Sequence, residues 1–103
     1  MRNGLALLAL FSLSACALSE DAYRDEQVRL DCERDNACAT ESGGDTQDCG
    51  ALTAPPNNSA FVCTFDADAA QDCLDAIPTA ECDGASYVQP VVCTDVFVDC
   101  QPR

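Results

Sequence analysis

The chain of 103 residues contains nine cysteines, an odd number, and eight of them follow position 16. Large apolar side chains are scarce in the same region: leucine, isoleucine, valine and phenylalanine make up 15 of the 88 residues from position 16 onward. So small a share, together with a high net charge, is typical of chains that cannot fold by burial alone. Four disulfides, each worth about 2–4 kcal/mol, can supply the missing stability. We therefore expect one small disulfide-held domain.

The ninth cysteine, Cys16, ends an apolar N-terminal stretch. Arg2 precedes an apolar run over residues 5–13, and the motif Leu13-Ser14-Ala15-Cys16 follows. The run is about half the ~20 residues that a membrane-spanning helix needs, and its order of positive, apolar and small residues is typical of an export signal. The motif resembles the lipobox of bacterial lipoproteins, whose cysteine becomes the lipid-bearing first residue. An ordinary secretory signal cut near the same site is the alternative.

The lipobox resemblance implies a domain organisation and a location. Residues 1–15 are then a removed signal peptide, Cys16 carries the lipid, residues 16–19 are a tether, and residues 20–103 are the domain. Two or more acyl chains hold a protein on a membrane stably, whereas one chain binds marginally. Lipoproteins retained in the inner membrane often have aspartate after the cysteine, and here Ala17 follows it. We expect a membrane-anchored protein of the cell envelope, in the outer membrane, facing the periplasm or the cell surface.

The charge of the chain excludes one class of partner. All 18 acidic residues follow Cys16, and the four arginines in that region leave a formal net charge of −14. Such a chain has no basic patch to neutralise phosphates, so nucleic acid is excluded as a partner. The acidic surface either keeps the domain soluble and away from anionic lipid, or attracts cations or a basic partner.

Two segments have the signals of helices. Ser19 can cap a helix that begins at residue 19 or 20 and runs to about Asn36, with arginines placed to pair with acids four residues away. A second helix is predicted over residues 66–77, capped by Asp66 and ended by Pro78. The apolar stripe of the second helix is Ala70, Cys73, Leu74 and Ile77.

The remaining segments are less regular. Composition predicts loops over residues 41–48 and 54–59. Residues 91–98 are rich in β-branched side chains, yet Pro90 suits the first turn of a short helix, which we favour. The expected fold class is therefore mainly α, a small disulfide-rich helical domain. An α+β fold with a short C-terminal hairpin is the alternative.

The second half of the chain resembles a group of exported proteins. The resemblance is carried by Phe65-Asp-Ala-Asp-Ala-Ala-Gln-Asp-Cys73-Leu-Asp-Ala-Ile77, by Cys82 and by Pro90-Val-Val-Cys93-Thr-Asp-Val-Phe97. The order is similar to that of the small cysteine-rich lipoproteins of myxobacteria and related deltaproteobacteria. It implies a mostly helical disulfide-linked fold and supplies no catalytic residues. The β-branched end of the chain, with Cys100, departs from it.

The residue types exclude several chemistries. The chain contains no histidine, which removes Ser-His and Cys-His catalysis and imidazole metal ligands. It contains no Cys-x-x-Cys, so thioredoxin-like redox activity and thiolate zinc sites are disfavoured. Disulfides remain as the role of the cysteines. The eight cysteines expected in disulfides are Cys32, Cys38, Cys49, Cys63, Cys73, Cys82, Cys93 and Cys100.

The spacing of these cysteines restricts their pairing. Cys32 and Cys38 cannot bridge within one helix, because about 9 Å of rise separates them. The pairings that we favour are Cys73 with Cys82 and Cys93 with Cys100. Eight cysteines have about 105 possible connectivities, so the rest stays open.

Calcium is the one ligand worth weighing for an acidic exported chain. Asp66-Ala67-Asp68 opens like an EF-hand loop, but Ala70 and Gln71 occupy positions that need an oxygen ligand and a glycine, and Ile77 is at the twelfth position. We interpret Asp66 and Asp68 as residues of a helix start. No metal and no other cofactor is expected.

The aromatic residues and the acids leave the function open. The four aromatic residues that can form either an exposed patch or the core are Tyr23, Phe61, Tyr87 and Phe97. We favour the core for most of them. We expect a non-enzymatic interaction or structural module, held on the membrane through Cys16, with a protein partner in the envelope. A calcium-binding or adhesion-type surface protein is the alternative.

Overall fold

A computed structural model describes residues 17–55 and 60–103. In these two ranges the chain forms two α-helices, two short antiparallel sheets and three 3₁₀ segments. In chain order the elements are α2 (Glu20–Ser42), η1 (Cys49–Ala51), β1 (Phe61–Phe65), α3 (Ala67–Ala76), η2 (Ile77–Thr79), β2 (Cys82–Asp83), β3 (Ser86–Tyr87), η3 (Val91–Asp95) and β4 (Phe97–Pro102). The expected signal peptide, residues 1–15, and Cys16 lie outside the described residues.

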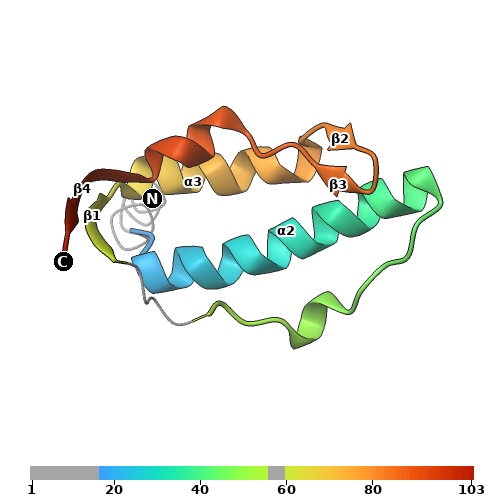
Figure 1. The fold of residues 1–103 in the computed structure, drawn as a ribbon, viewed down its shortest axis with the longest axis horizontal. Helices are drawn as coiled ribbons and strands as arrows, with labels where there is room; N and C mark the ends of the chain where they lie inside the picture. Colours follow the sequence, from blue (N-terminus) through green and yellow to red (C-terminus); the bar gives the residue numbers. More distant parts are fainter. Residues whose placement is uncertain (1–16, 56–59) are drawn as a thin grey trace, which may run out of the picture.

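The two helices lie side by side and the sheets lie at opposite ends of them (Figure 1). Helices α2 and α3 run in the same direction, and η3 returns over α3. The β1–β4 sheet lies beside the start of both helices, whereas the β2–β3 hairpin packs on the second half of α2. The start of α2 and the β1–β4 sheet therefore form one end of the molecule, which we call the sheet end.

Helix α2 begins at the predicted residue but ends later than predicted. The Ser19 hydroxyl oxygen accepts a hydrogen bond from the amide of Ala22 at 3.1 Å, as an N-cap does. The helix continues past Asn36 because Cys38 lies on it fully buried and joins another element. It ends at Gly43, whose φ of 81° is a left-handed conformation that glycine adopts without strain.

Helix α3 confirms the second predicted helix. The Asp66 carboxylate accepts a hydrogen bond from the amide of Ala69 at 3.0 Å and caps the helix. The segment η2, which contains Pro78, ends it. All four residues of the predicted stripe are at most 6% exposed: Ala70, Cys73, Leu74 and Ile77.

The fold class predicted from the sequence, mainly α, is wrong: the described chain is mixed α+β. Strand β1 was not predicted, and it pairs antiparallel with β4, with a register shift between Val62 and Thr64. The tail forms both structures considered for it, since η3 is a short helical segment and β4 a strand. Strand β4 finds its partner more than 30 residues earlier in the chain, so it does not form the C-terminal hairpin of the alternative prediction.

The hairpin of the structure is instead β2–β3. Cys82 lies opposite Tyr87, and Asp83 lies opposite Ser86, so two residues form the turn. The first of them, Gly84, has a φ of 65°, which a tight hairpin turn requires and glycine permits. This short hairpin brings Cys82 and Tyr87 against α2.

One small core joins the helices to the sheet end. It contains Tyr23 of α2, the buried stripe of α3 and Val96. The rings of Tyr23, Phe65 and Phe97 meet with centroids 5.7–6.0 Å apart, which joins α2, β1 and β4. Edge and tilted ring contacts of this kind add to the apolar burial. The prediction that most of the four aromatic residues belong to the core is confirmed for Tyr23, Tyr87 and Phe97, whereas Phe61 is 50% exposed.

Four disulfides join the eight cysteines, and both favoured pairings are wrong. The bridges are Cys32–Cys49, Cys38–Cys82, Cys63–Cys100 and Cys73–Cys93. The chain does not turn straight back after Pro78. The hairpin carries Cys82 to α2, and η3 then brings Cys93 over α3. The exclusion of a Cys32–Cys38 bridge agrees with the structure, because both residues lie on α2.

We expect removal of the Cys73–Cys93 bridge to cost more than removal of Cys63–Cys100. The chain-entropy effect alone favours the reverse order, because 37 residues separate the second pair and 20 the first. Cys73 is fully buried in the core, whereas Cys100 is exposed. Loss of core packing should therefore raise the cost of C73A/C93A to about 4–5 kcal/mol, against about 3 kcal/mol for C63A/C100A.

Urea unfolding of both double variants measures this difference. Peptide mapping without reduction serves as the control, because each variant should retain the other three bridges. A larger loss of unfolding free energy in C63A/C100A would mean that burial at Cys73 is not the deciding factor.

Candidate functional site

The predicted lipidation site adjoins a firmly held part of the fold. Cys16 lies outside the described residues, and the two residues after it lead directly into the domain. Leu18 packs against the core, and Ser19 caps α2. Leu18 and Ser19, the second half of the tether expected over residues 16–19, are therefore part of the fold.

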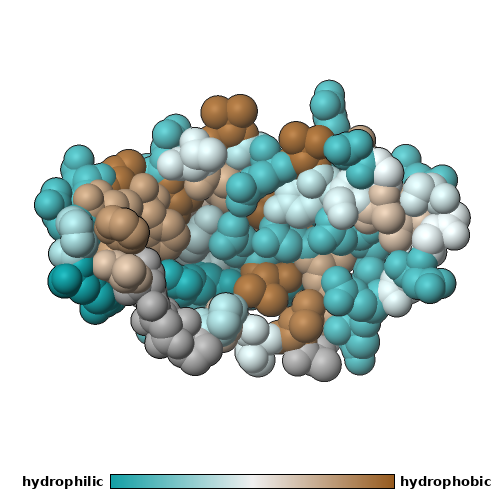
Figure 2. Space-filling model, viewed as in Figure 1, coloured by the Kyte–Doolittle hydropathy of each residue, from teal (hydrophilic) through white to brown (hydrophobic). Residues whose placement is uncertain are grey.

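A shallow hollow lies at the sheet end. It has a volume of about 250 Å³. Its lining residues are Glu20, Arg24, Phe61, Val62, Cys63, Phe97 and Arg103. Phe61 is 50% exposed and Val62 is 51% exposed. Figure 2 shows apolar side chains gathered at this end of the molecule.

Arg24 contacts two other residues that line this hollow. Its Nε lies 3.3 Å from a carboxylate oxygen of Glu20, one turn earlier on α2. Its guanidinium also lies 5.4 Å from the centre of the Phe97 ring, a cation–π contact. Arg24 therefore links the start of α2 to β4, and its charge is balanced by Glu20.

Hydrogen bonds from Tyr87 to two aspartates hold the β2–β3 hairpin on α2. The Tyr87 hydroxyl donates a hydrogen bond to the Asp31 carboxylate, and the Tyr87 amide donates one to Asp35 at 3.0 Å. Burial raises the pKa of the Asp31 carboxyl above its ordinary value, although the Tyr87 bond opposes this. Burial, followed by the hydrogen bond to Asp31, raises the pKa of the Tyr87 hydroxyl. Both shifts arise mainly from burial of the two groups where the hairpin packs on α2.

Arg34 reinforces the same hairpin. Its Nε donates a hydrogen bond of 2.7 Å to the carbonyl oxygen of Ala80, and a second nitrogen lies 3.6 Å from the sulfur of Cys82. The sequence suggested that the arginines of this helix pair with acids one turn away. Arg34 instead bonds to a backbone carbonyl 46 residues later in the chain.

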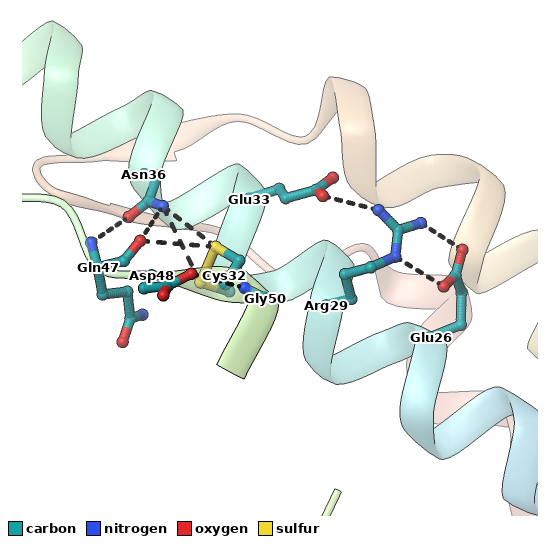
Figure 3. A network of polar contacts seen from close by, with 9 residues as sticks. Glu26, Arg29, Cys32, Glu33, Asn36, Gln47, Asp48 and Gly50 are labelled. Atoms are coloured by element: carbon teal, nitrogen blue, oxygen red, sulfur yellow. Dashed lines mark hydrogen bonds and ion pairs between the residues drawn. A yellow bond between two sulfur atoms is a disulfide. The ribbon is translucent and has the colours of Figure 1, made fainter. Parts of the chain in front are cut away.

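The outer side of α2 carries two further groups of polar contacts (Figure 3). The Asn36 side chain accepts a hydrogen bond from the amide of Gln47 and donates one to its carbonyl oxygen, beside the Cys32–Cys49 bridge. Arg29 pairs with Glu26 and Glu33 at 2.5 and 2.7 Å. All three charged side chains are more than 40% exposed, so solvent screens these pairs and they add little to stability.

The acids of the described chain do not gather into a metal site. No group of three or more Asp, Glu, Cys or His side chains within residues 17–55 and 60–103 could hold an ion. Asp66 caps α3, and Asp68 lies in its first turn, which confirms their interpretation as helix-start residues. In the same ranges no helix has both the length and the apolar character to cross a membrane.

The other exposed apolar residues lie away from the sheet end. Val88 is 49% exposed and Val91 is 82% exposed, and both line a shallow groove beside η3. We treat it as surface.

No protein-family model, curated protein or solved structure matches this chain.

We expect Tyr87→Phe to lower the free energy of unfolding by about 1–2 kcal/mol at pH 7, because it leaves the partly buried Asp31 carboxylate without its donor. Asp31→Asn is the matched control. It keeps an acceptor for Tyr87, and it removes a charge whose raised pKa shows that the folded state disfavours it. Asp31→Asn should thus be at least as stable as the wild type at pH 7. A loss as large as that of Tyr87→Phe would contradict this role for Asp31.

The raised pKa of Tyr87 also predicts a loss of stability at high pH. An unfolded tyrosine ionises near pH 10, whereas folded Tyr87 keeps its proton there. The unfolded state then binds fewer protons than the folded state, so stability falls as pH rises above 10. The slope from this group cannot exceed ~1.4 kcal/mol per pH unit, because one hydroxyl releases at most one proton. Urea unfolding from pH 9 to 11 should give a shallower decline for Tyr87→Phe, and equal slopes would contradict the assignment.

Proposed function

We propose that this chain is a lipid-anchored protein of the bacterial cell envelope, whose acidic, disulfide-held domain acts as a non-enzymatic interaction or structural module. The main support for the proposal is the pairing of the cysteines in disulfides. Every cysteine within residues 17–55 and 60–103 is in a disulfide, so none remains there to pair with Cys16. Cys16 itself ends the motif that resembles a lipobox.

The four disulfides also support export. Bridges of this density form and persist in oxidising compartments, such as the bacterial periplasm or the cell surface. The domain buries few large apolar side chains, so it would lose much of its stability in a reducing cytosol. Export and folding therefore depend on each other.

The polar groups of the domain support a role other than catalysis. The chain has no histidine. Asp31 and Tyr87, both with raised pKa values, are bonded to each other and hold the hairpin on α2. The net charge of −14 from position 16 onward favours a partner with a basic surface.

Intact mass spectrometry of the protein purified from bacterial membranes tests this function. We expect a mass increase of two or more acyl chains located on Cys16, no free thiols, and recovery in the outer-membrane fraction. Cys16→Ser should release the protein from membranes while keeping the four disulfides and the melting temperature. Ala17→Asp is the matched variant: it should keep the lipid and move the protein to the inner membrane.

Two results would overturn the proposal. One is wild-type protein without acyl mass on Cys16. The other is Cys16→Ser protein that remains bound to membranes after a wash at high salt, because attachment would then be independent of the lipid.

A further inference from the structure

The path from the predicted anchor to the fold is very short. Leu18 packs against the core, so two residue steps separate Cys16 from a side chain that moves with the domain. An extended chain spans at most about 3.6 Å per residue, which limits this gap to about 7 Å. A domain tethered this closely cannot turn freely above a bilayer.

The sheet end is the part of the fold that this tether reaches. Glu20 and Arg24, in the first turns of α2, line the same hollow as Phe61 and Val62 of β1. Figure 1 shows the start of α2 beside β1 and β4, at the opposite end from the β2–β3 hairpin. The residues nearest Cys16 and the β1–β4 sheet therefore face the same side.

The surface at this end is suited to a lipid interface. Phe61 and Val62 are both about half exposed, and amphipathic membrane-surface segments bury such side chains at the boundary of headgroups and acyl chains. The charged side chains of the hollow are two arginines, Arg24 and Arg103, and one glutamate, Glu20. Asp21 on α2 and Asp99 on β4 also lie at this end, so the sheet end is acidic outside the hollow, and an apolar contact there suits a neutral lipid surface better than an anionic one.

We propose that the sheet end lies on the bilayer, with Phe61 and Val62 in contact with the lipid interface. This inference depends on the lipid anchor proposed above. The contact is apolar, so it needs no anionic lipid, and it holds the long axis of α2 away from the membrane. The hairpin and the acids of the second half of α2 then face away from the bilayer, where a soluble partner can reach them.

Tryptophan fluorescence in proteoliposomes tests this orientation, because the chain contains no tryptophan of its own. Single variants Phe61→Trp and Val62→Trp place a reporter at the sheet end. Val91→Trp is the matched control, since it replaces an apolar side chain that is 82% exposed on η3. Each full-length lipidated protein is reconstituted in phosphatidylcholine vesicles whose acyl chains carry bromine, which quenches nearby tryptophan. Peptide mapping without reduction, which must find the four native bridges, checks that each variant is folded.

We expect the two sheet-end reporters to be quenched at least twofold and shifted to shorter wavelength, while Val91→Trp stays unquenched in vesicles that float with the protein. Floating protein with no quenching at either sheet-end position, or equal quenching at Val91→Trp, overturns the orientation and leaves the anchor intact. Protein that does not float at all overturns both the anchor and this inference. Concentration-dependent dimerisation that protects the sheet-end reporters from lipid would assign this surface to a second copy of the chain and overturn the proposal.

Discussion

The two disulfides on helix α2 are the constraint on which the second half of the fold depends. Helix α2 has 23 residues and buries four: Tyr23, Cys32, Cys38 and Ala39. Two of these are cysteines, bonded to Cys49 and Cys82. After Tyr23, the side chains of α2 that contact the rest of the fold are therefore mainly cysteines and polar residues. In a larger domain, an apolar stripe would make these contacts. Covalent bonds replace burial as the force that holds the η1 segment and the hairpin in place.

The domain is consequently stabilised differently at its two ends. At the sheet end, the rings of Tyr23, Phe65 and Phe97 and the stripe of α3 form a conventional core. At the hairpin end, the Cys38–Cys82 bridge is accompanied by hydrogen bonds from Tyr87 to Asp31 and Asp35. A partly buried carboxylate without a hydrogen-bond donor would be destabilising there. The bridge holds Tyr87 close to Asp31 and Asp35, and the hydrogen bonds of Tyr87 in turn hold the hairpin against α2.

The features that the sequence predicts correctly are local. Ser19 and Asp66 cap helices by accepting hydrogen bonds from amides three residues later in the chain. The buried stripe of α3 likewise repeats within one helix. The missed features are those that depend on distant partners. Strand β1 is ordered by its pairing with β4. The five residues of β1 have no hydrophobic pattern that would predict this distant partner. The disulfide map was missed for the same reason, as was the Tyr87–Asp31 contact, which spans 56 residues. Cys16 was identifiable because its motif is contiguous.

An acidic domain on a short lipid tether faces a conflict between attachment and repulsion, and the fold offers a physical resolution. Charge repulsion falls off within about 8 Å at physiological salt, so the acids that matter are those nearest the lipid. At the sheet end, Arg24 pairs with Glu20, and Phe61 and Val62 present apolar surface beside the acids Asp21 and Asp99. Acids on the second half of α2 and on the hairpin lie further along the molecule. In the proposed orientation, the acids of the hairpin end face the solvent beyond the range of this repulsion, and the apolar contact at the sheet end opposes the repulsion of the nearer acids.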